Sequence, residues 1–99
     1  MERIVGKFNL PHPGHFNQLW LSLESRVCHV AMQGVNTYAA PFIWIETDAD
    51  NLRYSIEVWV LATGAHIPHG LKHVGTYFQD AEGTEVWHVY VRDNDGVLA

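Results

Sequence analysis

The chain has 99 residues, of which 47% are hydrophobic and only 17% are charged, and its formal net charge is −5. A chain of this length has room for one core and not for two, so we expect residues 1–99 to form a single β-rich domain. The acidic balance and the six scattered Lys and Arg residues disfavour direct nucleic-acid binding, because a phosphate backbone requires a basic surface.

Alternation of polar and apolar residues, which is typical of β-strands, runs through most of the chain. In chain order it predicts strands over residues 3–10, 26–33, 41–46, 53–61, 71–79 and 84–92. Residues 16–23 are ambiguous, because their apolar positions fit the spacing of a helix and that of a strand equally well. Turns are expected at residues 48–51 and 80–83, which are rich in polar residues and Gly.

Two of the predicted strands have faces of different character. Their apolar faces consist of alternate residues: Tyr54, Ile56, Val58 and Val60 in the first, and Trp87, Val89 and Val91 in the second. The opposite faces carry Trp59 and Tyr90 beside polar residues, so we expect something to cover them. Gly75 interrupts residues 71–79, at a position where a strand commonly bulges or lets another backbone approach.

These elements predict an all-β fold, either a small antiparallel β-sandwich or a strongly curved sheet of about six or seven strands. Cys28 is the only cysteine, and we expect it to be a buried structural thiol in a reducing compartment. No apolar stretch has the ~18 residues of a membrane helix, and the N-terminus has no signal-peptide pattern. We therefore expect a cytoplasmic protein without membrane contact.

Several short motifs follow one another in a characteristic order. They are His29-Val30-Ala31-Met32-Gln33, Phe42-Ile43-Trp44-Ile45-Glu46, Thr63-Gly64 followed by His66-Ile67-Pro68, Val74-Gly75-Thr76, and Val86-Trp87-His88-Val89-Tyr90. In this order the chain resembles a family of small bacteriophage and prophage proteins of unknown function. Ala62 and Ala65 depart from that family's pattern around the Thr-Gly pair. The resemblance implies a strand at residues 17–23 and a location in the cytoplasm of a bacterial host, but it implies no activity.

Seven histidines raise the hypothesis of a metal site, and His66, His69 and His73 are the closest group. Pro68 and Gly70 make a helix through this group unfavourable, and no Cys or carboxylate within it completes a set of four ligands. We therefore interpret these residues as loop histidines and expect neither a metal nor another cofactor.

No catalytic motif accompanies the residues that have catalytic chemistry. No serine has a Gly-x-Ser-x-Gly elbow, and His88 would need an orienting partner such as Glu85 to act as a base. The Thr63-Gly64 pair lacks the Gly-Lys of a phosphate-binding loop and is interpreted as a turn, with a small anion nest as the alternative. The sequence therefore predicts a protein that is not an enzyme.

Four Trp and four Tyr residues are consistent with a binding surface, because both residue types are frequent in interface hot spots, and equally with a core made of large aromatics. The candidate binding residues are Arg53, Trp59, Thr63, Gly64, His66, His88 and Tyr90. Low charge and strands with two apolar faces also predict a homo-oligomer, joined through an exposed strand or an aromatic face.

Three functions fit these observations. Together with the phage resemblance, they predict a protein that acts by stoichiometric binding, most simply as an inhibitor of a host defence protein. The alternative is an oligomeric protein that sequesters a nucleotide-type signal molecule through aromatic stacking and phosphate contacts from Arg53, Lys72 or Arg92. The third hypothesis is a structural or assembly accessory protein.

Overall fold

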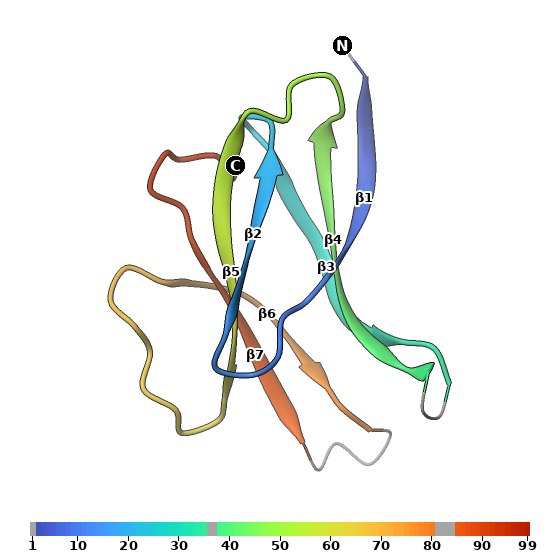
Figure 1. The fold of residues 1–99 in the computed structure, drawn as a ribbon, viewed down its shortest axis with the longest axis vertical. Helices are drawn as coiled ribbons and strands as arrows, with labels where there is room; N and C mark the ends of the chain where they lie inside the picture. Colours follow the sequence, from blue (N-terminus) through green and yellow to red (C-terminus); the bar gives the residue numbers. More distant parts are fainter. Residues whose placement is uncertain (1, 36–37, 81–84) are drawn as a thin grey trace.

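The computed structural model describes residues 2–35, 38–80 and 85–99, and within these ranges the chain is all-β (Figure 1). Seven strands follow one another: β1 (Arg3–Asn9), β2 (Phe16–Leu21), β3 (Arg26–Gln33), β4 (Ala40–Asp48), β5 (Tyr54–Ala62), β6 (Lys72–Phe78) and β7 (Val86–Arg92). The all-β prediction is confirmed, and the ambiguous residues 16–23 contain a strand. Within the same ranges, the chain has no helix that is long and apolar enough to cross a membrane.

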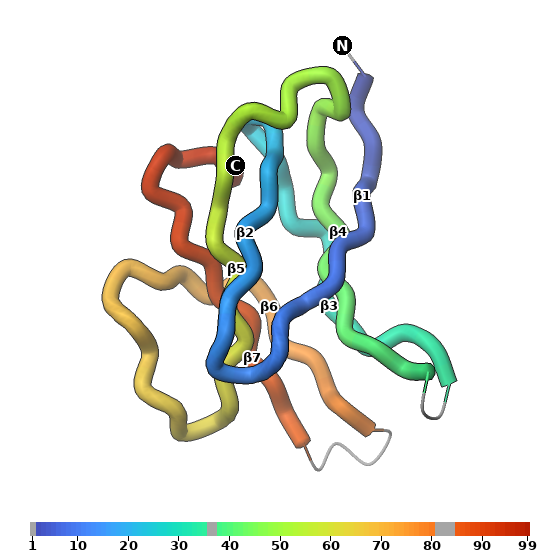
Figure 2. Tube along the Cα trace, in the orientation of Figure 1, coloured from blue at the N-terminus to red at the C-terminus, as the bar shows by residue number. Residues whose placement is uncertain are grey.

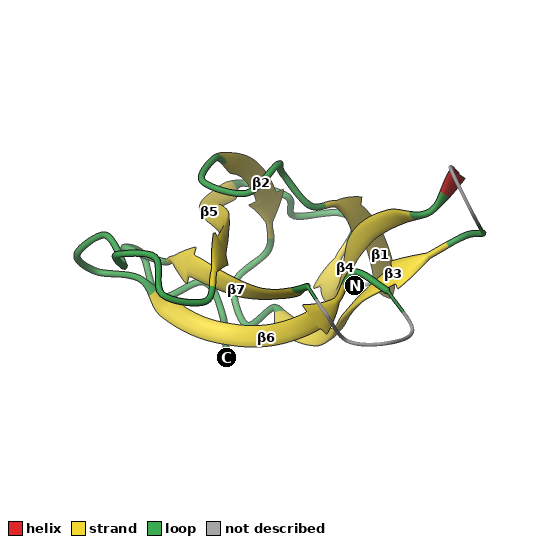
Figure 3. Cartoon of the chain, turned by 90° about the horizontal axis from the view of Figure 1, so that it is seen from below, coloured by secondary structure: helices red, strands yellow, loops and turns green. Residues whose placement is uncertain are grey.

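The strands form two antiparallel sheets that pack into a sandwich without closing into a barrel. The three-stranded sheet has the order β1-β4-β3, and the four-stranded sheet has the order β2-β5-β7-β6. The sheets come closest where β3 lies beside β6, as the view from below shows (Figure 3). The loop of residues 62–70, yellow to orange in Figure 2, projects away from the rest of the molecule.

The core lies between the sheets and is built from alternate residues of the central strands. Its fully buried apolar side chains are Leu21, Ile43, Ile45, Ile56, Val58, Val60, Val89, Val91 and Val97. The predicted inward faces of β5 and β7 are therefore confirmed at Ile56, Val58 and Val89, whereas Tyr54 at the start of β5 is exposed. The period of two places the residues between them on the outward faces.

Gly75 allows β6 to approach β3 closely. A Cβ atom at this position would lie only 2.5 Å from Cγ2 of Val30, well inside van der Waals contact. The pairing of β6 with β7 also shifts register between His73 and Gly75. The expected bulge at Gly75 is confirmed, and the group that approaches this glycine closely is the Val30 side chain rather than another backbone.

One end of the sandwich is closed by polar contacts and by the chain terminus. The Ser25 hydroxyl donates to Oγ1 of Thr47 (2.8 Å), which also accepts from the amide of Ser22 (3.0 Å). The Asp93 carboxylate accepts from the amides of Val97 (2.7 Å) and Leu98 (2.8 Å). These bonds hold the fully buried Val97 side chain against the end of the core.

The prediction that Cys28 is buried is wrong, because its side chain is exposed. The pairing of β3 with β4 shifts between Val27 and His29, so the simple alternation breaks at this bulge. Val27 and Val30 consequently face the same way, although they are three residues apart.

Thr84 and most of the turn predicted at residues 80–83 lie outside the described ranges.

Candidate functional site

A row of aromatic rings crosses the outward face of the four-stranded sheet. The register places Phe16 opposite Trp59, Trp59 opposite Tyr90, and Tyr90 opposite His73. The Phe16 and Trp59 rings stack with centroids 4.9 Å apart, and the His73 and Tyr90 rings meet edge to face at 5.3 Å. We call these four residues the aromatic row. Cross-strand pairs of this kind stabilise a sheet, and the row also presents ring surface to solvent.

A chain of hydrogen bonds runs beside the aromatic row. Nε2 of His88 lies 2.8 Å from Oγ1 of Thr63, and its Nδ1 lies 3.1 Å from Oγ1 of Thr76. Oγ1 of Thr76 is in turn 3.0 Å from Nε2 of His73. Both ring nitrogens of His88 are therefore engaged. A proton could be abstracted by His88 only after one of these hydrogen bonds breaks.

The charges next to the aromatic row are paired with each other. Nε of Arg92 lies 3.1 Å from Oε1 of Glu57, and the indole N–H of Trp59 donates to the same oxygen (3.1 Å). Arg92 also donates to the carbonyl oxygen of His69, which ties the loop of residues 62–70 to the sheet. This arrangement orients the Trp59 ring and leaves the cation of Arg92 already neutralised.

A small depression of about 190 Å³ lies between the aromatic row and the loop of residues 62–70. The residues that line it are Leu61, Ala62, Thr63, Gly64, Ala65, Ile67, His88 and Tyr90. Gly64 has a φ of 87°, in the left-handed region that favours glycine, as the turn interpretation of this pair requires.

The structure thus brings most of the sequence-predicted binding residues to one face. Trp59, His88 and Tyr90 lie on the sheet, and Thr63 and Gly64 lie in the adjoining loop. His66 belongs to the same loop but is exposed and does not line the depression. Arg53 is not part of this face. It lies at the closed end of the sandwich, in a polar groove with Arg3 and Asp48.

Two members of the aromatic row were not among the predicted binding residues. Alternation along β2 places Phe16 on the same outward face as Gln18 and Trp20. Its position opposite Trp59, however, depends on the pairing of two strands that are 43 residues apart in the sequence. His73 was considered only as a metal candidate. Among the described residues, no three His, Cys, Asp or Glu side chains come close enough together to hold a metal ion.

Comparison with known proteins adds the family. A domain of unknown function, DUF7352, matches residues 1–98. The chain belongs to the DUF7352 family. This confirms the expected membership of a family without an assigned function. Neither curated proteins nor solved structures provide a match to this DUF7352 chain.

Proposed function

We propose that this DUF7352 protein is a non-enzymatic binding protein that engages one partner protein in a fixed ratio. The observation that carries this proposal is the aromatic row of Phe16, Trp59, Tyr90 and His73 on an outward sheet face. Trp and Tyr are the residues in which binding energy concentrates at protein interfaces. The adjoining Arg92–Glu57 pair adds hydrogen-bonding groups without a large charge that would have to be desolvated.

The dimensions of this face favour a protein partner over a nucleotide. The depression beside the row, at about 190 Å³, is smaller than the ~300–1,000 Å³ of typical small-molecule pockets. The three cations considered for phosphate contacts also lie apart. Arg92 is bound to Glu57, and Arg53 lies at the closed end. Lys72 lies at the start of β6, in a pocket that Asp93 also lines. Sequestration of a nucleotide-type signal is therefore the less supported function.

The geometry of His88 supports binding rather than catalysis. Its two ring nitrogens hold Thr63 and Thr76, so the imidazole connects the loop of residues 62–70 to β6. His88 therefore helps to hold the loop of residues 62–70 in place at the edge of the binding face. We expect the His88→Ala variant to weaken binding only mildly, through loosening of the loop.

The resemblance to phage and prophage proteins bears on the identity of the partner. We propose that the protein works in the bacterial cytoplasm and that its partner is a host protein, most simply a defence protein that it inhibits. Small inhibitors of this kind act by occupying a surface of their target, for which an aromatic sheet face is suitable. Assembly accessory function remains the alternative for the same surface.

The test is the stoichiometry of the complex. Tagged protein is expressed in its bacterial host, and the purified complex is weighed by native mass spectrometry. We expect one partner at a fixed ratio, its loss in the Tyr90→Ala variant, and its retention in the Tyr54→Ala control, which changes an exposed tyrosine at the end of β5. The target's activity should fall in proportion to added protein and reach its limit at the same ratio.

An enzyme would behave differently. Substoichiometric protein would process an excess of the target, and the His88→Ala variant would abolish processing while binding and folding persist. That combination of results would overturn the proposal.

A further inference from the structure

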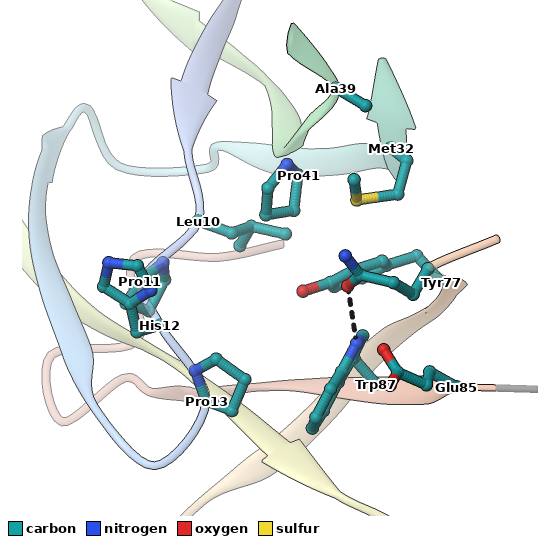
Figure 4. A pocket seen from close by; sticks show the side chains of 11 residues that line it. Leu10, Pro11, His12, Pro13, Met32, Ala39, Pro41, Tyr77, Glu85 and Trp87 are labelled. Carbon is teal, nitrogen blue, oxygen red and sulfur yellow. Dashed lines mark hydrogen bonds between the residues drawn. The ribbon is translucent and has the colours of Figure 1, made fainter. Parts of the chain in front are cut away.

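A cleft opens between the two sheets at the end of the sandwich opposite the closed end. Its volume is about 360 Å³, within the range of small-molecule sites. Three parts of the chain line it (Figure 4). The first is the segment after β1, with Leu10, Pro11, His12 and Pro13, and the second is the adjacent ends of β3 and β4, with Met32, Ala39 and Pro41. The third is the end of β6 and the start of β7, with Tyr77, Gln79, Glu85 and Trp87.

Tyr77 places an unpartnered hydroxyl group in this cleft. The residue is only 4% exposed, and its side chain reaches from β6 into the cleft toward Leu10 and Pro11 (Figure 4). No hydrogen-bond partner for this hydroxyl lies within the described part of the chain. Fully buried side-chain N and O atoms in that part all have partners, so the oxygen is open to the cleft. A ligand in the cleft can supply the missing acceptor.

Burial favours the neutral form of this group. Desolvation raises the pKa of Tyr77 from its ordinary 10.0 to about 12. A phenol keeps its proton at physiological pH at either value, so the hydroxyl group acts as a hydrogen-bond donor.

Hydrogen bonds between the lining residues hold the walls of the cleft in place. The indole N–H of Trp87 donates to the side-chain oxygen Oε1 of Gln79 (2.9 Å). The backbone N–H of Gln79 donates to the backbone carbonyl oxygen of Glu85 (2.9 Å). Across the cleft, the amide of Leu10 donates to the carbonyl oxygen of Pro41 (3.0 Å). Trp87 has thus satisfied its only donor, and what it offers a ligand is its ring.

The lining also defines the charge of a suitable ligand. Most of the lining side chains are apolar, and no Lys or Arg lies among the lining residues that the structure describes. Glu85 is the acidic side chain among the described lining residues, which also include His12. A phosphate or carboxylate group would be repelled by Glu85 and would find no Lys or Arg in the described lining to compensate for its desolvation.

We propose that the cleft binds a neutral, planar heteroaromatic ring of nucleobase type, which packs against Trp87 and accepts a hydrogen bond from the Tyr77 hydroxyl. Rings of this size fit the volume, and ring-on-ring packing with Trp is favourable for any neutral heterocycle. The site shares no residue with the aromatic row, so it can exist whether or not that row binds a protein.

The test uses adenine, which has ring nitrogens that accept hydrogen bonds, and indole, which has only a donor. Each is titrated into ¹⁵N-labelled protein while the indole N–H signals of the Trp residues are followed by NMR. We expect saturable shifts at Trp87 and not at Trp59 for both probes. The Tyr77→Phe variant should weaken adenine binding about tenfold and leave indole binding unchanged, because it removes one hydrogen bond but keeps the ring.

Two further variants and one further probe complete the experiment. Tyr54→Phe, the same substitution at the other end of the sandwich, should leave the affinity for adenine unchanged, and adenosine monophosphate should bind more weakly than adenine. Ala39→Phe fills the cleft and should abolish binding of both probes, with circular dichroism reporting whether the variant is folded.

Three results would overturn the proposal. The first is no saturable shift with either probe up to millimolar concentration. The second is shifts that centre on Trp59. The third is unchanged adenine affinity in the Tyr77→Phe variant, which is decisive even if Ala39→Phe does not fold. None of these results bears on the stoichiometry of a protein complex at the aromatic row.

Discussion

The outward faces of the two sheets contain similar aromatic residues but differ in how these are covered. On the three-stranded sheet, Trp44 lies near His29, with ring centroids 5.7 Å apart, and near Phe42, at 6.1 Å. The ammonium group of Lys7 lies 4.5 Å from the centre of the Phe42 ring and also donates to Gln33 (2.7 Å). The long Lys7 side chain therefore covers the Phe42 ring on this face.

A cluster of three charged side chains also lies on the three-stranded sheet. The carboxylate of Glu46 is held between Arg3 (3.0 Å) and Arg26 (3.2 Å), one from each edge strand. Among the described residues, the four-stranded sheet has one ion pair, between Arg92 and Glu57, and several of its large aromatic side chains are exposed. Phe16, Trp20 and Phe78 are 48%, 53% and 58% exposed.

The difference between the faces shows that aromatic content alone does not identify a binding surface. Each face has a central Trp, Trp44 on β4 and Trp59 on β5, and each Trp has an aromatic neighbour. On the three-stranded sheet a cation lies over the Phe42 ring, whereas on the four-stranded sheet the Phe16 ring, stacked on Trp59, is 48% exposed. A partner would displace the Lys7 ammonium group to reach Phe42, whereas Phe16 is accessible without such a rearrangement.

The sharpest test of this comparison is a matched pair of truncations. We expect Trp59→Ala to weaken binding of the partner protein at least about thirtyfold, which is the ~2 kcal/mol typical of a hot-spot Trp. Trp44→Ala should change the affinity less than about threefold, as for a contact outside a hot spot. Titration calorimetry with the purified partner measures both, after circular dichroism has confirmed that each variant is folded. Equal losses in the two variants would show that the two faces do not differ in function.

The second largest effect concerns stability and the contact between Gly75 of β6 and Val30 of β3, which packs the two sheets together. Gly75→Ala places a methyl group 2.5 Å from Cγ2 of Val30, so we expect it to lower the free energy of unfolding by about 1–3 kcal/mol. Val30→Ala in the same chain should recover part of this loss, because it removes the clashing atom. Urea denaturation of the four members of this cycle gives the coupling energy. Additive losses would mean that β3 and β6 are not in contact at this point.

Much of the fold could be predicted because the period of two is a local property. Alternate residues of β5 and β7 face the core as expected, and Gly75 lies at a bulge and a close approach. The bulge at Cys28 could not be read from the alternation, because His29 and Val30 fit either register until β4 pairs with them. Exposure of the thiol follows from that pairing.

The candidate site was predictable only in part, for the same physical reason. The outward direction of Trp59, His88 and Tyr90 follows from alternation within two strands. The approach of Thr63 to His88 and of Phe16 to Trp59 depends on strands distant in sequence. The cleft is assembled from segments throughout the chain, and no local pattern marks it. The position of Arg53 likewise depends on how the β4–β5 turn lies over the closed end.

A third test compares the edge strands of the two sheets. Trp20 on β2 is 53% exposed and Val5 on β1 is 58% exposed. We predict a homodimer or larger oligomer that uses the β2 edge, because the larger apolar surface lies there. Trp20→Lys should raise the dissociation constant of self-association about tenfold, and the matched Val5→Lys should leave it unchanged. Sedimentation velocity measures both, and a wild-type protein that sediments as a single chain at micromolar concentration would contradict the prediction.

The smallest expected effect is a pH dependence that belongs to the three-stranded face. Hydrogen bonds from Arg3 and then Arg26 hold the pKa of Glu46 below its ordinary value of 4.5. Because the pKa in the folded state is lower than in the unfolded state, the unfolded chain binds the proton first as the pH falls. The stability that Glu46 contributes is therefore fully present above its ordinary pKa and is lost as the pH falls through the lowered value.

The Glu46→Gln variant isolates this contribution, since it keeps the size of the side chain and removes its titration. At about pH 6 the variant should be less stable than the wild type in urea denaturation, and the difference should shrink as the pH falls below the ordinary 4.5 and through the lowered pKa of Glu46. The difference at about pH 6 should also be smaller at high salt, because the carboxylate and both guanidinium groups are partly exposed. A difference that stays constant with pH would mean that Glu46 acts through packing rather than charge. The charged cluster that distinguishes this face from the aromatic row would then not depend on ionisation of Glu46.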